Sequence, residues 1–167
     1  MNAYTNRIIR EATAADIYLI HTLAHAVWPI TYEHILSSAQ LQYMLALIYS
    51  EAALQNQFNE GHHFLIVEED GTAVAFADYS LLKNDVYKLN KIYVLPHQQG
   101  KGTGKFLIDA VIDKVKQANG SSLLLNVNRH NKAKAFYEYL GFKVIGEEDI
   151  DIGKGFFMND YVMQKTL

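Results

Sequence analysis

A short glycine-rich segment has the residue types and spacing that point most directly to chemistry. It reads QGKGTG at residues 99–104 and falls between a predicted strand at 86–95 and a predicted helix at 103–118. The N–H groups and the dipole at a helix start favour an anion, and glycines let a phosphate approach the backbone closely. The segment therefore predicts a phosphate-binding turn, although such turns also join strands to helices for purely steric reasons.

Two common phosphate-binding motifs do not fit this turn. A P-loop needs Ser or Thr after its lysine, whereas Phe106 follows Lys105, so no hydroxyl is available to hold magnesium. A dinucleotide-binding fold needs a third glycine two positions further on and an early strand–helix–strand unit. Here the spacing is G-x-G-x-G and the turn lies mid-chain, which disfavours both interpretations.

The turn and its surroundings resemble a known family. The segment YKLNKIYVLPHQQGKGTGKFLIDAVI is similar to the signature of the GNAT superfamily of N-acetyltransferases, in which a strand, a Q/R-x-x-G-x-G/A turn and a helix follow one another. A second block, NRHNKAKAFYEYLGFKVIGEE, and the closing run GKGFFMNDYVMQKTL also resemble this superfamily, the last its small-amine and polyamine-acetylating members. The resemblance covers residues 64–167, and the first 60 residues match by element order alone.

The resemblance implies a binding site for acetyl-CoA. Backbone N–H groups of the turn would hold the pyrophosphate, and Lys101 and Lys105 would add charge unless they are solvated surface residues. The preceding strand would splay from the strand at 122–127 and bind the pantetheine and the acetyl carbonyl, with the Val94 N–H stabilising the oxyanion by about 3 kcal/mol. The implied cofactor-binding residues are Ile92, Tyr93, Val94, Gln99, Gly100, Lys101, Gly102, Thr103, Gly104, Lys105, Asn131, Lys134 and Tyr137.

The same resemblance assigns catalytic roles to Tyr137 and Val94. Tyr137 occupies the position of the tyrosine that hydrogen-bonds the thioester sulfur and protonates the departing thiolate. Without the motif, an aromatic residue packed beside Phe136 is the simpler interpretation. The F-Y-x-x-x-G-F setting favours the catalytic role.

The general base and the acceptor pocket are left open by the sequence. Many relatives place a glutamate on the strand before the turn, but residues 88–91 read KLNK. Asp78 and Glu33 are possible substitutes, yet most such carboxylates are solvated or cap helices. We expect Trp28, Tyr32 and Asp78 to contribute to substrate binding, although aromatic residues after a helix more often belong to the core.

Composition narrows the functional classes. The chain of 167 residues has 50% hydrophobic residues, a net charge of -3 and no cysteine, which predicts one domain over 1–167 and excludes disulfides and thiolate chemistry. It has no broad basic surface for nucleic acid and no apolar run of membrane-spanning length. His21 and His25 have metal-ligand spacing, but no third ligand is evident, so we expect no metal. We expect a soluble cytoplasmic protein with no membrane or nucleic-acid partner.

The elements that position these residues follow from patterning and caps. We predict a strand at 7–11, a helix from Thr13 towards Val27 that Pro29 ends, and two helices capped by Ser38 and Ser50. Two strands joined at residues 70–71 form a hairpin, and further strands are predicted at 86–95, 122–127 and around 142 and 161. Helices at 103–118 and 132–140 end at Gly120 and Gly141. The predicted fold class is α/β (α+β), a mixed, mostly antiparallel sheet of about seven strands flanked by helices.

Three functions are consistent with this pattern. The leading hypothesis is an acyl-CoA-dependent N-acetyltransferase that transfers acetyl from acetyl-CoA to a primary amine of a small molecule, such as a polyamine or amino compound, in a ternary complex. A protein or peptide N-acetyltransferase is the second, and it would need an open groove. A non-catalytic acyl-CoA-binding sensor is the third. A homodimer is plausible by family analogy.

Overall fold

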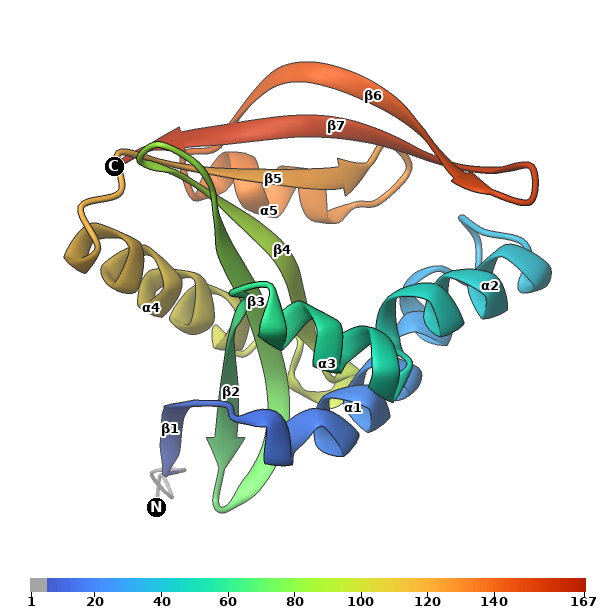
Figure 1. Cartoon of the computed structure of the whole chain (residues 1–167). Helices are drawn as coiled ribbons and strands as arrows, with labels where there is room; N and C mark the ends of the chain where they lie inside the picture. Colours follow the sequence, from blue (N-terminus) through green and yellow to red (C-terminus); the bar gives the residue numbers. More distant parts are fainter. Residues whose placement is uncertain (1–5) are drawn as a thin grey trace.

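A seven-stranded sheet with strand order β1-β2-β3-β4-β5-β7-β6 forms the centre of the structure (Figure 1). The computed structural model describes residues 6–167. Only β4 and β5 pair in parallel, and every other neighbouring pair is antiparallel. This confirms the predicted mixed sheet. The strands are β1 Arg7–Glu11, β2 His63–Glu69, β3 Thr72–Lys83, β4 Val86–Val94, β5 Ser122–Asn128, β6 Lys143–Gly153 and β7 Phe156–Thr166.

Helices cover both faces of the sheet. The first three pack on one face, around a core that includes Ile20, Leu54 and Phe76, and the last two pack on the other, around Leu107, Val111 and Leu125. The helices are α1 Ile17–Thr31, α2 Ser38–Tyr49, α3 Glu51–Asn59, α4 Thr103–Gln117 and α5 Ala133–Tyr139. Within residues 6–167, no helix is both long and apolar enough to cross a membrane.

The N-terminal helices correct two sequence predictions. Pro29 lies inside α1 rather than ending it, because proline removes a single N–H bond and the Tyr32 N–H still closes the last turn on the Trp28 carbonyl at 3.0 Å. The cap of α2 is Ser37, one residue before the predicted Ser38, and its hydroxyl accepts the Gln40 N–H. The capping box predicted at Thr13 is present, although it opens a short 3-10 turn ahead of α1.

Turns at residues 70–71 and 119–120 set the ends of two elements. Asp70 and Gly71 both have positive φ, which is the conformation that the Asp-Gly pair predicted for the β2–β3 hairpin. After α4, however, the left-handed residue is Asn119 rather than the predicted Gly120. Gly120 is needed for space instead, because a Cβ there would lie 2.3 Å from Cγ1 of Val115.

The sheet divides between β4 and β5. These strands pair only over residues 86–89 and 122–125, and β4 then continues to Val94 with β3 as its sole strand partner among the described residues. The pairs Asp78–Lys91 and Tyr79–Leu89 leave Asn90 as an extra residue in β4, and such a bulge bends and twists its strand. Figure 1 shows β5, β6 and β7 as a separate wing that diverges from β1–β4.

Gly120→Ala tests the close packing that holds α4 on the sheet. The added methyl group would overlap Val115 and approach the Tyr87 ring, so we expect a loss of about 1–3 kcal/mol in the free energy of unfolding. Urea unfolding measures this loss. Gly146→Ala in β6 is the control, because nothing lies within 4 Å of the position that its new methyl group would take, and equal losses for the two variants would contradict the packing argument.

Candidate functional site

A cavity of about 1030 Å³ begins where β4 and β5 part and reaches both faces of the sheet. One end is lined by the glycine-rich turn, the start of α4 and α5. The other end is lined by α1, α2 and the β6–β7 hairpin. A single space therefore joins the predicted phosphate turn to the predicted acceptor region.

The glycine-rich turn presents backbone donors to this cavity. Gly100 and Gly102 have φ of +77°, and Gly102 is the N-cap of α4 without any side-chain cap. The first bond of α4 runs from the Phe106 N–H to the Gly102 carbonyl, which leaves the N–H groups of residues 103–105 without a partner inside the helix. Such groups, together with the helix dipole, form an anion-binding site.

A buried glutamine fixes the position of this turn. Gln98 is 2% exposed, its amide donates to Glu69 of β2 at 2.9 Å, and its carbonyl accepts the Thr103 hydroxyl at 3.1 Å. Arg7 also pairs with Glu69 and donates to the Lys101 carbonyl. The turn is thus tied to the sheet through side chains. The Gln99 and Lys101 N–H groups donate to the Pro96 and Gln98 carbonyls, whereas those of residues 103–105 have no partner inside the helix.

The predicted cofactor-binding residues fall into two groups. Those that line the cavity are Ile92, Tyr93, Val94, Gln99, Gly100, Gly102, Thr103, Gly104, Lys105, Asn131 and Tyr137. Lys101 and Lys134 lie outside the lining, and the Lys134 amine pairs with Glu138 at 2.7 Å. The Lys105 amine pairs with Asp109, so its charge is shared with a neighbouring carboxylate.

The two predicted catalytic residues line the same cavity. Val94 ends the unpaired part of β4, and Tyr137 lies on α5 with 8% of its surface exposed. Burial raises the pKa of the Tyr137 phenol, and the nearby Tyr32 raises it further. The phenol is therefore protonated at neutral pH, as a proton donor must be.

Aromatic side chains form the other end of the cavity. Trp28 and Tyr32, both predicted to bind substrate, line it together with Tyr49 and Tyr93. The hydroxyls of Tyr32 and Tyr93 are 3.0 Å apart, and the rings of Trp28 and Tyr32 are 4.5 Å apart. The indole N–H of Trp28 is buried without a hydrogen-bond partner among the described residues.

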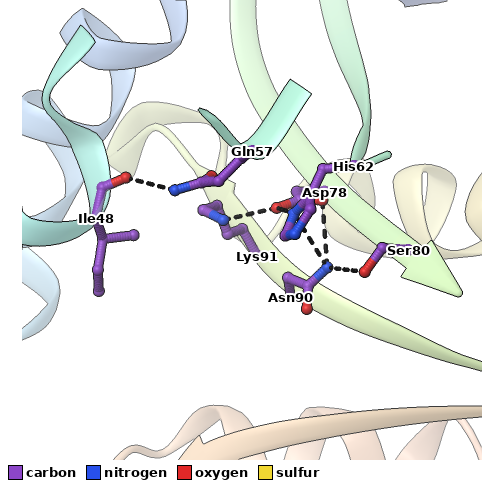
Figure 2. A network of polar contacts seen from close by, with 7 residues as sticks. All are labelled: Ile48, Gln57, His62, Asp78, Ser80, Asn90 and Lys91. Atoms are coloured by element: carbon purple, nitrogen blue, oxygen red, sulfur yellow. Dashed lines mark hydrogen bonds and ion pairs between the residues drawn. The ribbon is translucent and has the colours of Figure 1, made fainter. Parts of the chain in front are cut away.

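The predicted carboxylates Asp78 and Glu33 do not reach the cavity. Glu33 is exposed beside His34. Asp78 is completely buried, and Figure 2 shows its carboxylate surrounded by donors. Its Oδ2 accepts the Lys91 amine at 2.6 Å and the His62 ring at 2.7 Å. Lys91 and Asn90, rather than Asp78, are the residues around this carboxylate that line the cavity.

This network stabilises the bulge in β4. The side-chain amide of Asn90, the bulged residue, donates to Ser80 at 2.8 Å and to Asp78 at 3.3 Å. Burial lowers the pKa of the Lys91 amine, and the charge of Asp78 opposes that effect. The ion pair between Asp78 of β3 and Lys91 of β4 therefore helps to hold β4 in its bent conformation.

A third carboxylate, which sequence analysis did not single out, does line the cavity. Asp160 of β7 is 7% exposed, and its Oδ2 lies 3.4 Å from the side-chain amide of Asn126. The alternation of residues along β7 could have pointed to it. Met158, Asp160 and Val162 share one face of this strand, so Asp160 places a charge in an otherwise apolar row.

Comparison with known proteins agrees with this geometry. Residues 33–164 match the model of the acetyltransferase (GNAT) domain. The chain belongs to the GNAT acetyltransferase family. It is 34% identical over 85 residues to the uncharacterised N-acetyltransferase YhfO of Bacillus subtilis, a match that covers 47% of this chain and 57% of that protein.

Two further relatives widen the comparison of this GNAT family member. A ribosomal-protein alanine N-acetyltransferase of Haemophilus influenzae is 29% identical over 109 residues, covering 65% of this chain and 70% of that protein. The crystal structure of the PaiA N-acetyltransferase of Thermoplasma acidophilum, in complex with coenzyme A, superimposes with a TM-score of 0.82 at 26% identity and covers 97% of this chain and 99% of the other. The seven-stranded fold of the family is thus present in this chain.

Lys91→Met tests whether the buried ion pair holds β4. Removal of the amine leaves the Asp78 carboxylate buried with less compensation, so we expect a loss of about 3–5 kcal/mol in the free energy of unfolding. The double variant Lys91→Met with Asp78→Leu removes both charges and should recover much of that loss. Denaturant unfolding of both variants is the measurement, and a double variant as unstable as Lys91→Met would contradict the account.

Proposed function

We propose that this protein is an acyl-CoA-dependent N-acetyltransferase that transfers acetyl from acetyl-CoA to a primary amine of a small molecule. The observation that supports this proposal most directly is the cavity, which joins free N–H groups at the start of α4 to the unpaired part of β4 and to Tyr137. Membership of the GNAT family and the coenzyme A complex of the PaiA structure support the proposal.

The residues of the turn and of β4 fit acetyl-CoA. The N–H groups of residues 100 and 102–105 would bind the pyrophosphate, because those of Gln99 and Lys101 already donate to carbonyls within the turn. Glycine at 100 and 102 allows the positive φ that this turn requires. Backbone groups of Ile92 and Val94 that lack a β5 partner would bind the pantetheine and the acetyl carbonyl. Asn131 lines the same end of the cavity and would contact the cofactor.

Two residues would act on the thioester. The Val94 N–H would stabilise the negative charge that develops on the carbonyl oxygen when the amine attacks, an effect worth about 3 kcal/mol for one donor. Tyr137 would donate its proton to the sulfur as the carbon–sulfur bond breaks. Its raised pKa keeps the phenol protonated until that step.

The acceptor end of the cavity favours a small amine. α2 and the β6–β7 hairpin meet across it, where the Tyr43 hydroxyl donates to the Ile152 carbonyl at 2.5 Å and the Gln40 amide donates to the Phe157 carbonyl at 2.7 Å. In Figure 1 the tip of the hairpin lies beside α2. We call the end of the cavity lined by Trp28, Tyr32, Tyr49 and Tyr93 the aromatic chamber. The contacts between α2 and the hairpin border this chamber and narrow the opening through which a folded protein chain would have to enter.

A protein N-terminus is the second candidate acceptor. The similarity to the ribosomal-protein alanine N-acetyltransferase of Haemophilus influenzae favours it. A flexible N-terminal segment enters a narrower opening than a lysine on a folded surface does. An acceptor panel of polyamines, amino acids, aminoglycosides and short peptides with N-terminal alanine separates the two candidates.

Release of free thiol from acetyl-CoA in the presence of this panel is the test of the proposed function. We expect turnover with a small amine, and turnover with peptides alone would move the assignment to the second candidate. Measurable acetyl-CoA binding without turnover across the panel would instead indicate a non-catalytic sensor.

Tyr137→Phe should lower kcat about 100-fold or more, because the sulfur loses its proton donor, while the dissociation constant for acetyl-CoA stays unchanged. Thiol release and calorimetric titration give the two quantities. Tyr139→Phe, on the same helix but 83% exposed, is the matched control and should have parental activity. An unchanged kcat in Tyr137→Phe would remove the proton-donor role.

Gly102→Val should weaken acetyl-CoA binding by about tenfold or more, because a β-branched residue at positive φ distorts the turn. Gly61→Val is the control, since Gly61 also has positive φ and open space around it but lies outside the cavity lining. Both variants should lose similar stability in thermal unfolding, and only Gly102→Val should lose affinity in calorimetry. Equal affinities for the two variants would contradict the phosphate assignment.

A further inference from the structure

Asp160 is a buried carboxylate on the cavity wall for which the steps above provide no role. Resting on the proposed function, we propose that Asp160 binds the ammonium group of the acceptor and takes the proton that this group must lose before it attacks the thioester. The acceptor class that this assigns is a primary alkylamine that reaches the site as a cation. Such amines have a pKa of about 10.4 and are almost entirely protonated at neutral pH.

The position of Asp160 in the sheet carries the first part of the argument. Asp160 pairs with Asn128 of β5 and Glu148 of β6 in the strand register, and its carboxylate lies on the face of β7 that also presents Met158. Met158 packs against the core formed by α1–α3, so this is the acceptor face of the sheet. The carboxylate therefore opens into the aromatic chamber beside Tyr32 rather than towards α4 and α5.

The charge of Asp160 is available, in contrast to that of Asp78. The Asp78 carboxylate is occupied by Lys91, His62 and Asn90. Among the described residues, Asp160 takes part in no ion pair within 4 Å, and its side chain accepts a single long hydrogen bond from Asn126. A buried carboxylate with so little compensation is well suited to bind a cation from outside the protein.

The charged groups around Asp160 act on it in opposite directions. Glu148 of β6 shares the Asn126 amide and repels it, and the charge of Asp160 in turn raises the pKa of Tyr32, which follows α1. Lys88 of β4, which lines the same cavity, and Arg129, which pairs with Asp149 and donates to the main-chain carbonyl of Asp160, both lower the pKa of the Asp160 carboxyl. Burial is the largest influence and raises the pKa of the Asp160 carboxyl, which brings it closer to the range of an efficient base.

The walls of the chamber suit the same ligand. Trp28, Tyr32 and Tyr93 surround this part of the cavity, and the faces of aromatic rings attract an ammonium ion. Asp160 itself is 7% exposed, and the attraction between a bound ammonium and a carboxylate is stronger where water is excluded from the carboxylate. An acceptor that is neutral or anionic at neutral pH gains neither contact.

The proposed proton transfers balance. Asp160 accepts one proton from the ammonium, and the freed nitrogen lone pair forms the new bond to the thioester carbon. The carbon–sulfur bond then breaks with its electron pair on sulfur, which receives the Tyr137 proton. The nitrogen gives its second proton back to Tyr137, and Asp160 releases its own to solvent, so that amide, free thiol and one proton are the products.

The same carboxylate should reduce the stability of the folded protein. An acid whose pKa is raised by folding binds its proton more tightly in the folded than in the unfolded chain, so stability falls as pH rises from the unfolded value of about 3.9 through the folded pKa. Asp160→Asn removes this ionisation. Its melting temperature at neutral pH should therefore equal or exceed that of the parent, which separates a lost base from a misfolded variant.

The test is the pH dependence of kcat/KM for Asp160→Asn, with the best alkylamine of the acceptor panel and saturating acetyl-CoA. At pH 7 we expect a loss of about 10²–10⁴-fold, with unchanged acetyl-CoA affinity. The parent should give a plateau between the pKa of Asp160 and that of the amine. The variant should instead rise about tenfold per pH unit from 7 to 9, because only the neutral fraction of the amine reacts. Glu33→Gln, which removes an exposed carboxylate outside the cavity lining, should behave as the parent.

The outcomes separate this inference from the function on which it rests. If the parent releases no thiol with any amine, the proposed function fails. If the parent turns over and Asp160→Asn keeps both its rate at pH 7 and the parental plateau, the function stands and the role of Asp160 is overturned. An amine with a pKa of about 8 should lose less in the variant than an alkylamine does, and equal losses would contradict the proton-accepting role.

Discussion

The parting of β4 from β5 after Leu89 and Leu125 is the constraint on which the rest of the site depends. Four residue pairs hold the two halves of the sheet together in parallel, and beyond them each strand keeps a partner on its outer side alone. Backbone groups in a continuous sheet satisfy one another and have no capacity for a ligand. Here the gap supplies unpaired groups at the centre of the fold, and the parallel direction of the two strands brings the turn after β4 and the start of α5, which follows β5, to the same end.

The divergence is maintained by side chains as well as by the backbone. The extra residue Asn90 bends β4, and its amide together with Lys91 is held by the buried Asp78. Asp78 and Asp160 are thus two buried carboxylates with different surroundings. The first is compensated by several donors and stabilises the geometry of β4. The second has one weak donor and faces the chamber, so its burial is unfavourable until a cation binds.

Local sequence patterns were sufficient for most elements of the fold. The Asp70-Gly71 turn, the helix opening at Gly102 and the strand at 122–128 each follow from residue types within a few positions. One error arose from packing that no local pattern contains. Pro29 was expected to end α1, but the buried faces of Trp28 and Tyr32 keep the last turn in place, and this packing involves residues distant in sequence.

The site was harder to predict where it depends on contacts across the sheet. The turn and Tyr137 are contiguous motifs, whereas the surroundings of Asp78 and Asp160 are set by partners 13 and 34 positions away in sequence, namely Lys91 and Asn126. Sequence analysis therefore named Asp78 and passed over Asp160. The register between strands decides which of the two carboxylates pairs with a cation, and a short sequence pattern does not determine the register between distant strands.

A crystal structure of the protein with acetyl-CoA is the most direct test of the claim that the gap between β4 and β5 is the acyl-CoA site. The account predicts pyrophosphate oxygens within hydrogen-bond distance of N–H groups of residues 100 and 102–105, and pantetheine lying between residues 90–94 of β4 and 126–128 of β5. Acetyl-CoA bound elsewhere on the protein, with the gap unoccupied, would contradict it.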